Sequence, residues 1–398
     1  MSFEMLEAKC SGTLIKVIGV GGAGGNAVAQ MIERGVKGVD FICANTDAQS
    51  LSKSPANLKL QLGESGLGAG AKPEKGKASA EAERDRIAEA LAGAHMVFIT
   101  AGMGGGTGTG AAPVVAEIAK ELGALTVAVV TKPFSFEGPS RSKVAEKGIK
   151  SLEESVDSLI VILNEKLEEV LGDEITQISA FNAADNVLYN AVAGIAEIIN
   201  VEGFVNVDFE DVKTVMSAQG KAMMGTATCE GENRAKEAAE NAVQSPLLEG
   251  IDLRGARGIL VNISASKSLK ISETKTAMES ISSFAAEDAT VMFGTVFDDN
   301  LGDELRVTVV ATGLGRETEL RSVPVEKPQE VIGTGTDGVI SHTSDNSSGG
   351  VSSDNLDVWN DPKSDADKRR EAIKKINALE EEGVETFDIP AFLRKQAD

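Results

Sequence analysis

Histidine and cysteine are scarce in this sequence. Only two of its 398 residues are histidines, His95 and His342, so chemistry that depends on several histidines is excluded. Its three cysteines, Cys10, Cys43 and Cys229, are odd in number and far apart. This spacing fits neither a disulfide framework nor a zinc site. The sequence therefore predicts a cytosolic protein whose cysteines are reduced and structural.

Long apolar runs and an excess of basic residues are also missing. No stretch approaches the ~20 apolar residues that a membrane helix requires. The first residues, MSFEMLEAKCSG, lack the basic start and apolar run of a signal peptide. The balance of 39 basic and 61 acidic residues gives a net charge of −22, which argues against nucleic acid and anionic lipid as partners. We therefore expect no nucleic-acid binding and no direct membrane insertion.

Apolar segments alternate with amphipathic ones between residues 13 and 130. TLIKVIGV, VDFICAN, MVFIT and LTVAVVT have the length and composition of buried strands, and segments such as NAVAQMIERG have helical spacing. This alternation is typical of an α/β fold in which a Rossmann-like parallel sheet is covered by helices on both faces. In such sheets ligands bind at the carboxyl ends of the strands.

The second half of the chain has a different pattern. Apolar residues from Phe181 to Ile199 step by three and four, which predicts one long helix over residues 178–203, buried between two domains. RGILVNISAS, ATVMFGTVFDD and LRVTVVATGL predict the strands of a second, smaller sheet, and NRAKEAAENAVQSPLL and SETKTAMESISSFAA predict its helices. After Gly315 the chain is rich in Gly, Ser and Asp and poor in apolar residues, which predicts disorder.

Three glycine-rich turns fall on the expected ligand-binding edge. AGMGGGTGTGAA, residues 101–112, links a strand to a helix, where free backbone N–H groups and the helix dipole favour a phosphate. It has no lysine and so differs from the G-x-x-x-x-G-K-[ST] loop. IKVIGVGGAGGNAV matches the G-x-G-x-x-G dinucleotide fingerprint, which alone is a weak signal, and GLGAGAKPEKG is a third small-residue turn. Together the turns indicate a phosphate chain clasped from two sides.

An NAD-dependent oxidoreductase is the alternative function at this point. It would use the fingerprint at residues 15–28, with Asp47 as the acidic residue that follows the second strand. That alternative does not explain the second glycine loop, and it supplies no evident acid or base for hydride transfer.

The glycine loops also resemble a known family. GGGTGTG after a strand, with GVGGAGGNA near the N-terminus, resembles the signature of the tubulin/FtsZ family. KPFSFEGPSR, FNAADNVL and NVDFEDV follow in the order and spacing of its FtsZ branch, and DIPAFLRKQAD is similar to the tail peptide of bacterial members. The resemblance covers residues 13 to about 315 and the last dozen residues of the chain. It implies a GTPase that polymerises head to tail and scaffolds the cytokinetic (Z) ring at the bacterial division site.

The resemblance also implies which residues bind the nucleotide. The first loop and the loop at 104–110 contact the phosphates, Gly70 and Ala71 lie nearest the γ-phosphate, and Glu137 with Arg141 binds the ribose and nearby groups. Without the family, that last pair would be a surface salt bridge of little energetic value. The implied residues are Gly21, Gly22, Ala23, Gly24, Gly25, Asn26, Gly70, Ala71, Gly104, Gly105, Gly106, Thr107, Gly108, Thr109, Gly110, Glu137, Arg141, Phe181 and Asp185.

Phe181 and Asp185 are four residues apart and share one face of the predicted helix. An aromatic ring can stack on a purine, and a carboxylate accepts hydrogen bonds from guanine N1–H and its amine but would repel adenine N1. Given the family, this pair predicts GTP rather than ATP; taken alone, it would be a core phenylalanine and a solvated aspartate. A terminal phosphate carries roughly −1.5 to −2 and a helix N-terminus offers roughly +0.5. We therefore expect GTP/GDP with Mg²⁺ bridging the β and γ oxygens, although no metal ligand can be named.

NVDFEDV, residues 206–212, carries two candidate catalytic acids. Asp208 could simply cap a helix, with Asp211 in its first turn. The resemblance implies instead that Asp208 and Asp211 polarise the attacking water. A helix of about 25 residues spans on the order of 37 Å, which separates these acids from Asp185. We therefore expect them to act on the nucleotide of a neighbouring subunit, in a heterologous contact that builds a filament.

The C-terminal segment TFDIPAFLRKQAD is unusually apolar for a frayed terminus, and we expect it to dock in a partner's groove. The resemblance implies membrane-tethering division adaptors and other division regulators as partners, and a cytoplasmic location at mid-cell on the inner face of the membrane. The partner-binding residues would be Asp388, Ile389, Pro390, Phe392 and Leu393. The predicted organisation is a GTP-binding domain (1–177), a central helix (178–203), a C-terminal α/β domain (204–315), a flexible linker (316–384) and a tail peptide (385–398).

Overall fold

The structure is a computed structural model of the chain. It describes residues 12–172, 175–200, 205, 207–218, 221–245, 256–286 and 289–314. Our predictions of a linker at 316–384 and of a partner-binding tail peptide at 385–398 lie outside the described residues.

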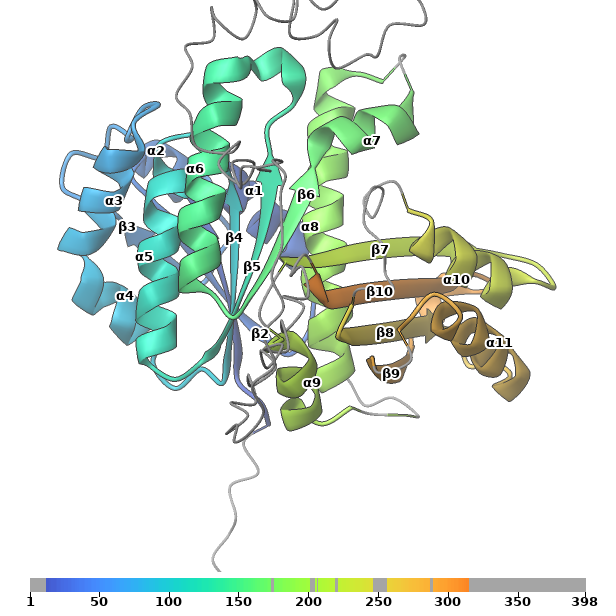
Figure 1. The fold of residues 1–398 in the computed structure, drawn as a ribbon. Helices are drawn as coiled ribbons and strands as arrows, with labels where there is room; N and C mark the ends of the chain where they lie inside the picture. The colour runs from blue at the N-terminus through green and yellow to red at the C-terminus, as the bar shows by residue number, and fades with distance from the viewer. Residues whose placement is uncertain are drawn as a thin grey trace, which may run out of the picture. The chain divides into compact units, whose positions relative to one another are not determined.

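The described strands form one ten-stranded sheet in the order β3-β2-β1-β4-β5-β6-β7-β10-β8-β9 (Figure 1). The first six strands pair in parallel, as the alternating pattern predicted. The last four are mixed, because β10 is antiparallel to both β7 and β8 while β8 and β9 are parallel. The strands are β1 Ile15–Val20, β2 Val39–Asn45, β3 Leu58–Gln61, β4 Met96–Gly102, β5 Leu125–Lys132, β6 Ser158–Leu163, β7 Lys221–Cys229, β8 Gly258–Ala265, β9 Thr290–Phe297 and β10 Leu305–Leu314.

Helices follow most of these strands. They are α1 Gly21–Glu33, α2 Ala48–Lys53, α3 Pro73–Ala82, α4 Arg84–Leu91, α5 Thr107–Glu121, α6 Pro139–Ser155, α7 Asn164–Leu171, α8 Gln177–Asn200, α9 Phe209–Met216, α10 Arg234–Val243 and α11 Ile271–Ser282, with short 3₁₀ turns η1 Ser135–Glu137 and η4 Asp299–Leu301. The long helix predicted at 178–203 corresponds to α8. Among the helices that the structure describes, none combines the length and apolarity needed to cross a bilayer.

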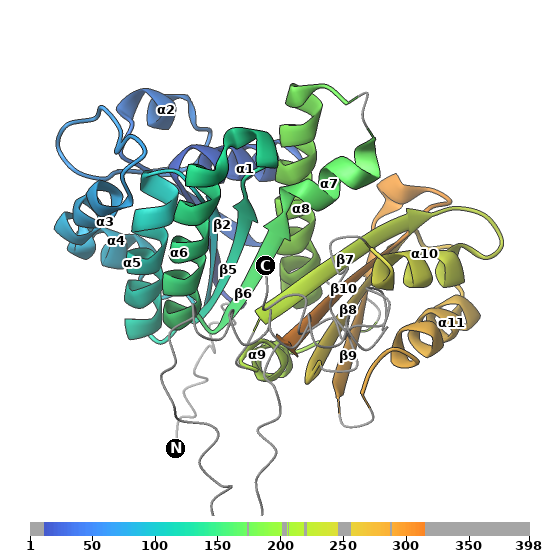
Figure 2. The ribbon, with the colours of Figure 1, turned by 45° about the horizontal axis from the view of Figure 1, so that its top comes forward.

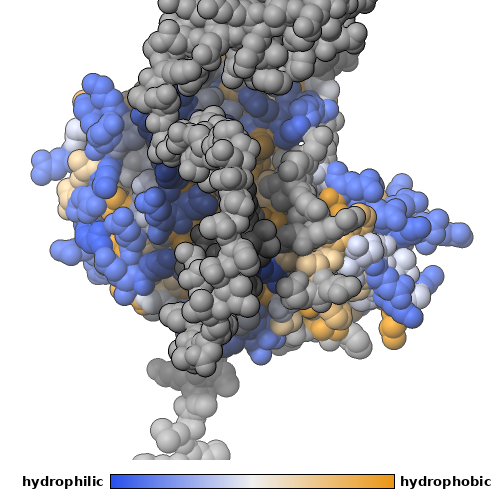
Figure 3. All heavy atoms as spheres, viewed as in Figure 1, coloured by the Kyte–Doolittle hydropathy of each residue, from blue (hydrophilic) through white to orange (hydrophobic). Residues whose placement is uncertain are grey.

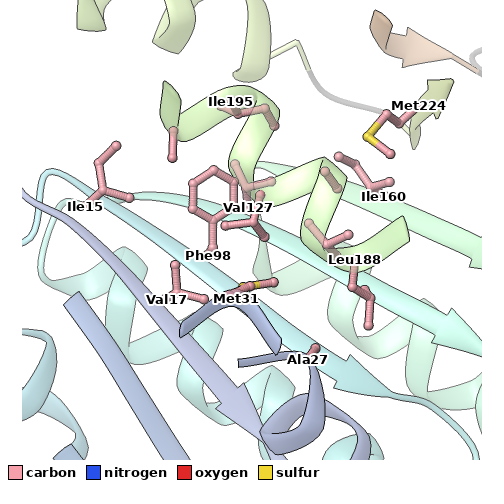
Figure 4. Close-up of a cluster of buried hydrophobic side chains, with 14 of the residues drawn as sticks. Ile15, Val17, Ala27, Met31, Phe98, Val127, Ile160, Leu188, Ile195 and Met224 are labelled. Carbon is pink, nitrogen blue, oxygen red and sulfur yellow. The ribbon is translucent and has the colours of Figure 1, made fainter. Parts of the chain in front are cut away.

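Two apolar cores cover the two faces of the parallel strands. Side chains alternate between the faces, so Phe98 of β4 lies in the core under α1 and α8, whereas Ile99 lies in the core under α3 to α6. Figure 4 shows Phe98 on the first face, close to Met31 of α1 and to residues of α8. The views in Figure 1 and Figure 2 agree on this double cover, and the outer surface over α3 and α4 is largely hydrophilic in Figure 3.

Helix α8 is buried along most of its length because its apolar side chains face two parts of the sheet. Leu188, Val192 and Ile195 lie in the same core as β5 and β6. On its other side, the Gly194 carbonyl oxygen accepts a hydrogen bond of 3.1 Å from Nδ2 of Asn262 on β8. The helix therefore connects the parallel strands to the last four strands.

The sequence predicted a second sheet separate from the first, and this was wrong in one respect. Strands β6 and β7 are paired through Leu159 with Lys221 and Ile160 with Ala222, so the two sets of strands form one continuous sheet. Beyond this short link, β7 pairs with β10 instead. The last four strands nevertheless have a core of their own, formed with α10 and α11.

Candidate functional site

A cavity of about 310 Å³ lies at the carboxyl ends of β1, β4, β5 and β6. This is the edge at which open parallel sheets bind their ligands. The cavity is lined by Gly22, Ala23, Gly70, Gly102, Met103, Gly105, Gly106, Thr107, Gly108, Thr131, Pro133, Glu137, Arg141, Asn164, Phe181, Ala184 and Asp185. All three predicted glycine turns, the Glu137–Arg141 pair and the Phe181–Asp185 pair therefore meet in one place.

Two helices begin at this cavity. Residues of their first turns line it, Gly22 and Ala23 from α1 and Thr107 and Gly108 from α5. The first N–H groups of a helix have no partner within the helix, and the helix dipole adds partial positive charge there. Two such ends on one cavity form a site suited to a chain of phosphates.

The loop before α5 is held from several sides. The Gly104 N–H donates a buried hydrogen bond of 2.9 Å to Oγ1 of Thr109, and the hydroxyls of Thr46 and Thr107 are 2.6 Å apart. At Gly106 a β-carbon would collide with the carbonyl oxygen of Gly70, so only glycine lets these two loops approach so closely. The loop is therefore fixed before a ligand binds.

The other end of the cavity has the features of a purine site. Phe181 and Asp185 both come from the start of α8, and the Phe181 side chain is 39 % exposed. Burial raises the pKa of Asp185 to about 6. A half-buried carboxylate beside an exposed ring can accept hydrogen bonds from a base that stacks on the ring.

Glu137 and Arg141 also line the cavity. Arg141 donates a hydrogen bond of 2.6 Å to Oε2 of Glu137, and Oε1 of Glu137 accepts one of 3.0 Å from the Phe134 backbone N–H. The pair offers one acceptor and one cationic donor to a ligand. It can therefore contact both a sugar hydroxyl and a neighbouring anionic group.

Sequence reasoning missed Asn164. Its side chain is 4 % exposed, it lines the cavity, and its Oδ1 has no hydrogen-bond partner within the described chain. A buried amide without a partner is costly unless a ligand or water satisfies it. The available signal was SLIVIL, a short apolar run at 158–163 that ends directly before this asparagine.

Eight other predicted residues do not line the cavity: Gly21, Gly24, Gly25, Asn26, Ala71, Gly104, Thr109 and Gly110. Some of them shape the loops from behind. A β-carbon on Gly24 would collide with the carbonyl oxygen of Thr100, so this glycine lets α1 pack closely on β4. Direct contact of these eight residues with a nucleotide stays a prediction.

Asp208 and Asp211 lie far from the cavity in the same chain. Oδ1 of Asp208 accepts a hydrogen bond of 2.8 Å from the Asp211 N–H, so Asp208 caps α9. The next residue, Phe209, packs its ring against His95, which directly precedes β4. The acids are therefore at the amino ends of the strands, where α9 lies in Figure 1. From the cavity residue Asp185 to its last residue, Asn200, α8 spans roughly 23 Å, and this length separates the acids from the cavity.

No group of three or more His, Cys, Asp or Glu side chains suited to a metal ion occurs within the described parts of residues 12–314. A nucleotide-bound Mg²⁺ often takes its ligands from phosphate oxygens and water rather than from a protein cage. The residues around the cavity fit that mode of binding.

Comparison with known proteins agrees with this geometry. Residues 14–172 match the Tubulin/FtsZ family, GTPase domain, and residues 220–315 match the FtsZ family, C-terminal domain. The chain is 53 % identical to the "Cell division protein FtsZ" of Coxiella burnetii over 399 residues, 99 % of each chain. It is 50 % identical to the protein of the same name from Pseudomonas aeruginosa over 402 residues, the whole of both chains.

The fold is also found in solved structures. An empty FtsZ dimer from M. jannaschii, 43 % identical, superposes with a TM-score of 0.74 over 77 % of this chain and 89 % of that one. These matches do not favour an NAD-dependent oxidoreductase. The chain belongs to the FtsZ family of cell-division proteins, and it is a GTPase with a tubulin-like GTPase domain.

Proposed function

We propose that this GTPase polymerises head to tail and that a neighbouring subunit completes each active site. Asp208 and Asp211 of one copy act on the GTP held by the next copy. The resulting filament scaffolds the cytokinetic ring at the division site. The single observation that carries this proposal is the distance between the two acids and the cavity of their own chain.

The cap on α9 suits a role for Asp208 in a neighbour's site. One oxygen, Oδ1, accepts the Asp211 N–H, which fixes the side chain, and the side chain is exposed. The other carboxylate oxygen, Oδ2, can accept a hydrogen bond from a water molecule. This hydrogen bond would increase the nucleophilicity of the water. Bound Mg²⁺ would neutralise charge on the β and γ oxygens. Loss of the γ-phosphate would then weaken the contact between subunits.

Exposed apolar side chains support a contact between copies. Phe136 and Ile178, 57 % and 74 % exposed, belong to the segments that carry the cavity residues Glu137 and Phe181. An apolar groove of about 550 Å³ begins at Val205, three residues before Asp208, and Ile271 on its wall is 85 % exposed. Clustered apolar side chains of this kind mark interaction surfaces. Joining one surface to the other gives a heterologous contact, which builds an open filament when the rotation between successive copies does not close a ring.

Within the cavity, we propose that the first turns of α1 and α5 bind the phosphates. Phe181 stacks on guanine and Asp185 accepts hydrogen bonds from its N1–H and its amine. A further donor group of the nucleotide forms a hydrogen bond with the unpaired Oδ1 of Asn164. The relatives are named cell-division proteins, which supports a cytoplasmic location at mid-cell. Membrane-tethering adaptors and other regulators would bind the tail peptide at 385–398.

Turnover at different protein concentrations tests the proposal. GTP turnover per subunit should rise from a low value at high dilution to a plateau, because isolated copies lack the acids of a neighbour. Phosphate release and light scattering, each in GTP and in GDP, measure turnover and assembly together. A turnover that stays constant through high dilution would contradict the proposal.

A groove variant sharpens this experiment. Ile271→Glu should shift the onset of turnover to higher protein concentration and leave GTP binding unchanged, since it alters only the apolar groove. Leu122→Glu is the matched control, because Leu122 is also exposed but lies outside both apolar surfaces. Equal shifts for both variants would count against a contact through the groove.

A further inference from the structure

Three phenylalanine rings form a wall beside the base end of the cavity. The rings of Phe134 and Phe136 are stacked with centroids 5.1 Å apart, and both meet the ring of Phe181 edge to face, at 5.3 and 6.5 Å. Aromatic pairs in these two geometries attract each other beyond the area that they bury. The position of one ring therefore restricts the positions of the other two.

The wall separates the nucleotide cavity from a second cavity. Phe181 lines the first, whereas Phe134 and Phe136 line a hollow of about 360 Å³ that also contains Ile175 and Ala180. Phe134 at the centre is 1 % exposed, and Phe136 at the outer end is 57 % exposed. Phe181 at the proposed base site thus meets Phe136 at the apolar surface both directly and through the buried ring of Phe134.

The backbone of the same segment is tied to the nucleotide cavity. Glu137 accepts the Phe134 N–H with one carboxylate oxygen and the Arg141 guanidinium with the other. Glu137 and Arg141 both line the cavity. A nucleotide that contacts this pair would therefore act on the turn Ser135–Glu137, which carries Phe136.

We propose that this three-phenylalanine wall couples occupancy of the base site to the apolar surface around Phe136. Phe134 and Phe136 are positioning residues, and they act through Phe181 rather than on the nucleotide itself. The inference rests on the proposed function, in which that surface contacts the next subunit. A base stacked on Phe181 limits the motion of its ring, this restriction reaches Phe136 both directly and through Phe134, and Phe136 is held in one orientation for the incoming copy.

The wall responds to the base and not to the terminal phosphate. GDP and GTP carry the same guanine, so both should order Phe136 equally, and the γ-phosphate must act through the loop around Gly70. Coupling between two binding events is reciprocal. Assembly should therefore tighten nucleotide binding, and it should do so only while the wall is intact.

A fluorescent reporter in unassembled protein tests the coupling. The only tryptophan of the chain is Trp359, so Trp359→Phe combined with Phe136→Trp leaves one tryptophan, at the surface end of the wall. At a concentration too low for assembly, GDP and GTP should change its emission to the same extent relative to nucleotide-free protein. A change produced by GTP alone, or no change at all, would overturn the proposal.

Phe134→Leu in this reporter should reduce the emission change at least twofold, because the shorter of the two ring contacts of Phe181 is lost. GDP affinity should stay within about threefold, or about 0.7 kcal/mol. Phe98→Leu is the matched control, since Phe98 is equally buried but lies in the core beneath α1 and α8, and its emission change should persist. Phe134→Met with a thermal unfolding scan separates loss of coupling from loss of folding. A full emission change in folded Phe134→Leu and Phe134→Met would refute the relay. The proposed function is tested separately, by turnover against concentration.

Discussion

Asp185 is the residue of the candidate site whose pKa is raised by its surroundings. Burial at the start of α8 raises its pKa to about 6, well above the usual value for an aspartate. The protonated form cannot accept two hydrogen bonds from guanine. Nucleotide binding must therefore compete with a proton at this carboxyl group.

GTP affinity should consequently fall as the pH is lowered. With a pKa near 6 in the empty protein, the dissociation constant should rise about tenfold between pH 7 and pH 5. The same raised pKa means that the folded empty protein binds more protons than the unfolded chain between about pH 4 and pH 6. The contribution of this group to folding stability is therefore greater at low pH and is lost as the pH rises through 6.

Calorimetric titration with GDP across this pH range measures the effect. Asp185→Asn should weaken binding about tenfold or more at pH 7 and remove the pH dependence, because an amide does not titrate there. Glu197→Gln is the matched control, since burial also raises the pKa of Glu197, farther along the same helix. If Asp185→Asn kept the full pH dependence, the assigned role of this carboxylate would be wrong.

Single residues differed in how well the sequence predicted them. Phe181 and Asp185 could be placed on one helix face from their spacing alone, and the structure has both at the cavity. Asn164 could not, because its importance comes from an unpartnered oxygen in a buried wall, and burial depends on contacts distant in sequence. The contact of Gly24 with the phosphates stays a prediction, and the structure adds a packing role for this glycine, which lets α1 lie close to β4.

In helix α9, one side chain both stabilises the helix and has a proposed role in the reaction. Asp208 caps the helix through the Asp211 N–H, and the same residue is the proposed catalytic acid. Substitution by alanine removes both roles, with a loss of about 1 kcal/mol of stability from the cap alone. A variant that keeps the cap is needed to separate them.

Asp208→Asn is that variant. Asparagine is as good a cap as aspartate, so the melting temperature should be nearly unchanged, but the charge that polarises water is lost. Turnover at a saturating protein concentration should fall about 100-fold or more. GTP binding and light scattering should persist. Glu210→Gln, in the same turn of α9, is the control and should retain turnover; equal loss in both variants would indicate a general charge effect.

Elements with strong apolar patterns were predicted, and those defined by tertiary contacts were not. The predicted strands β1, β2, β4, β5, β8, β9 and β10 are all present, as is α8. Strand β7, KAMMGTATC, has no clear alternation and is defined by its pairing with β10 over almost its whole length. Strand β6 is short and apolar, and such runs are ambiguous between strand and buried helix.

At the scale of the whole molecule, the division of each active site between two copies predicts rescue by mixing. Asp185→Ala copies should fail to bind GTP but still offer Asp208, whereas Asp208→Asn copies should bind GTP without cleaving it. Each variant alone should be inactive. An equal mixture should recover roughly a quarter of native turnover per subunit. Half of the copies, the Asp208→Asn variant, hold GTP, and half of these copies meet an Asp185→Ala neighbour that supplies Asp208.

Phosphate release from the mixture, with sedimentation to measure co-assembly, checks this prediction. The control replaces the Asp185→Ala copies with an Asp185→Ala, Asp208→Asn double variant, which supplies no acid and should give no recovery. Co-assembly without any recovered turnover would mean that the acids do not act across the contact.

The short link between β6 and β7 has a mechanical consequence. Among the described residues, only two ladder pairs connect the parallel strands to the last four strands within the sheet, whereas α8 packs against both sets through buried side chains of a shared core. If filaments form as proposed, tension along them would pass between the two sets of strands mainly through α8 and the core around it rather than through the sheet. The stiffness of each subunit under tension would then depend on α8 and on the contacts that anchor it.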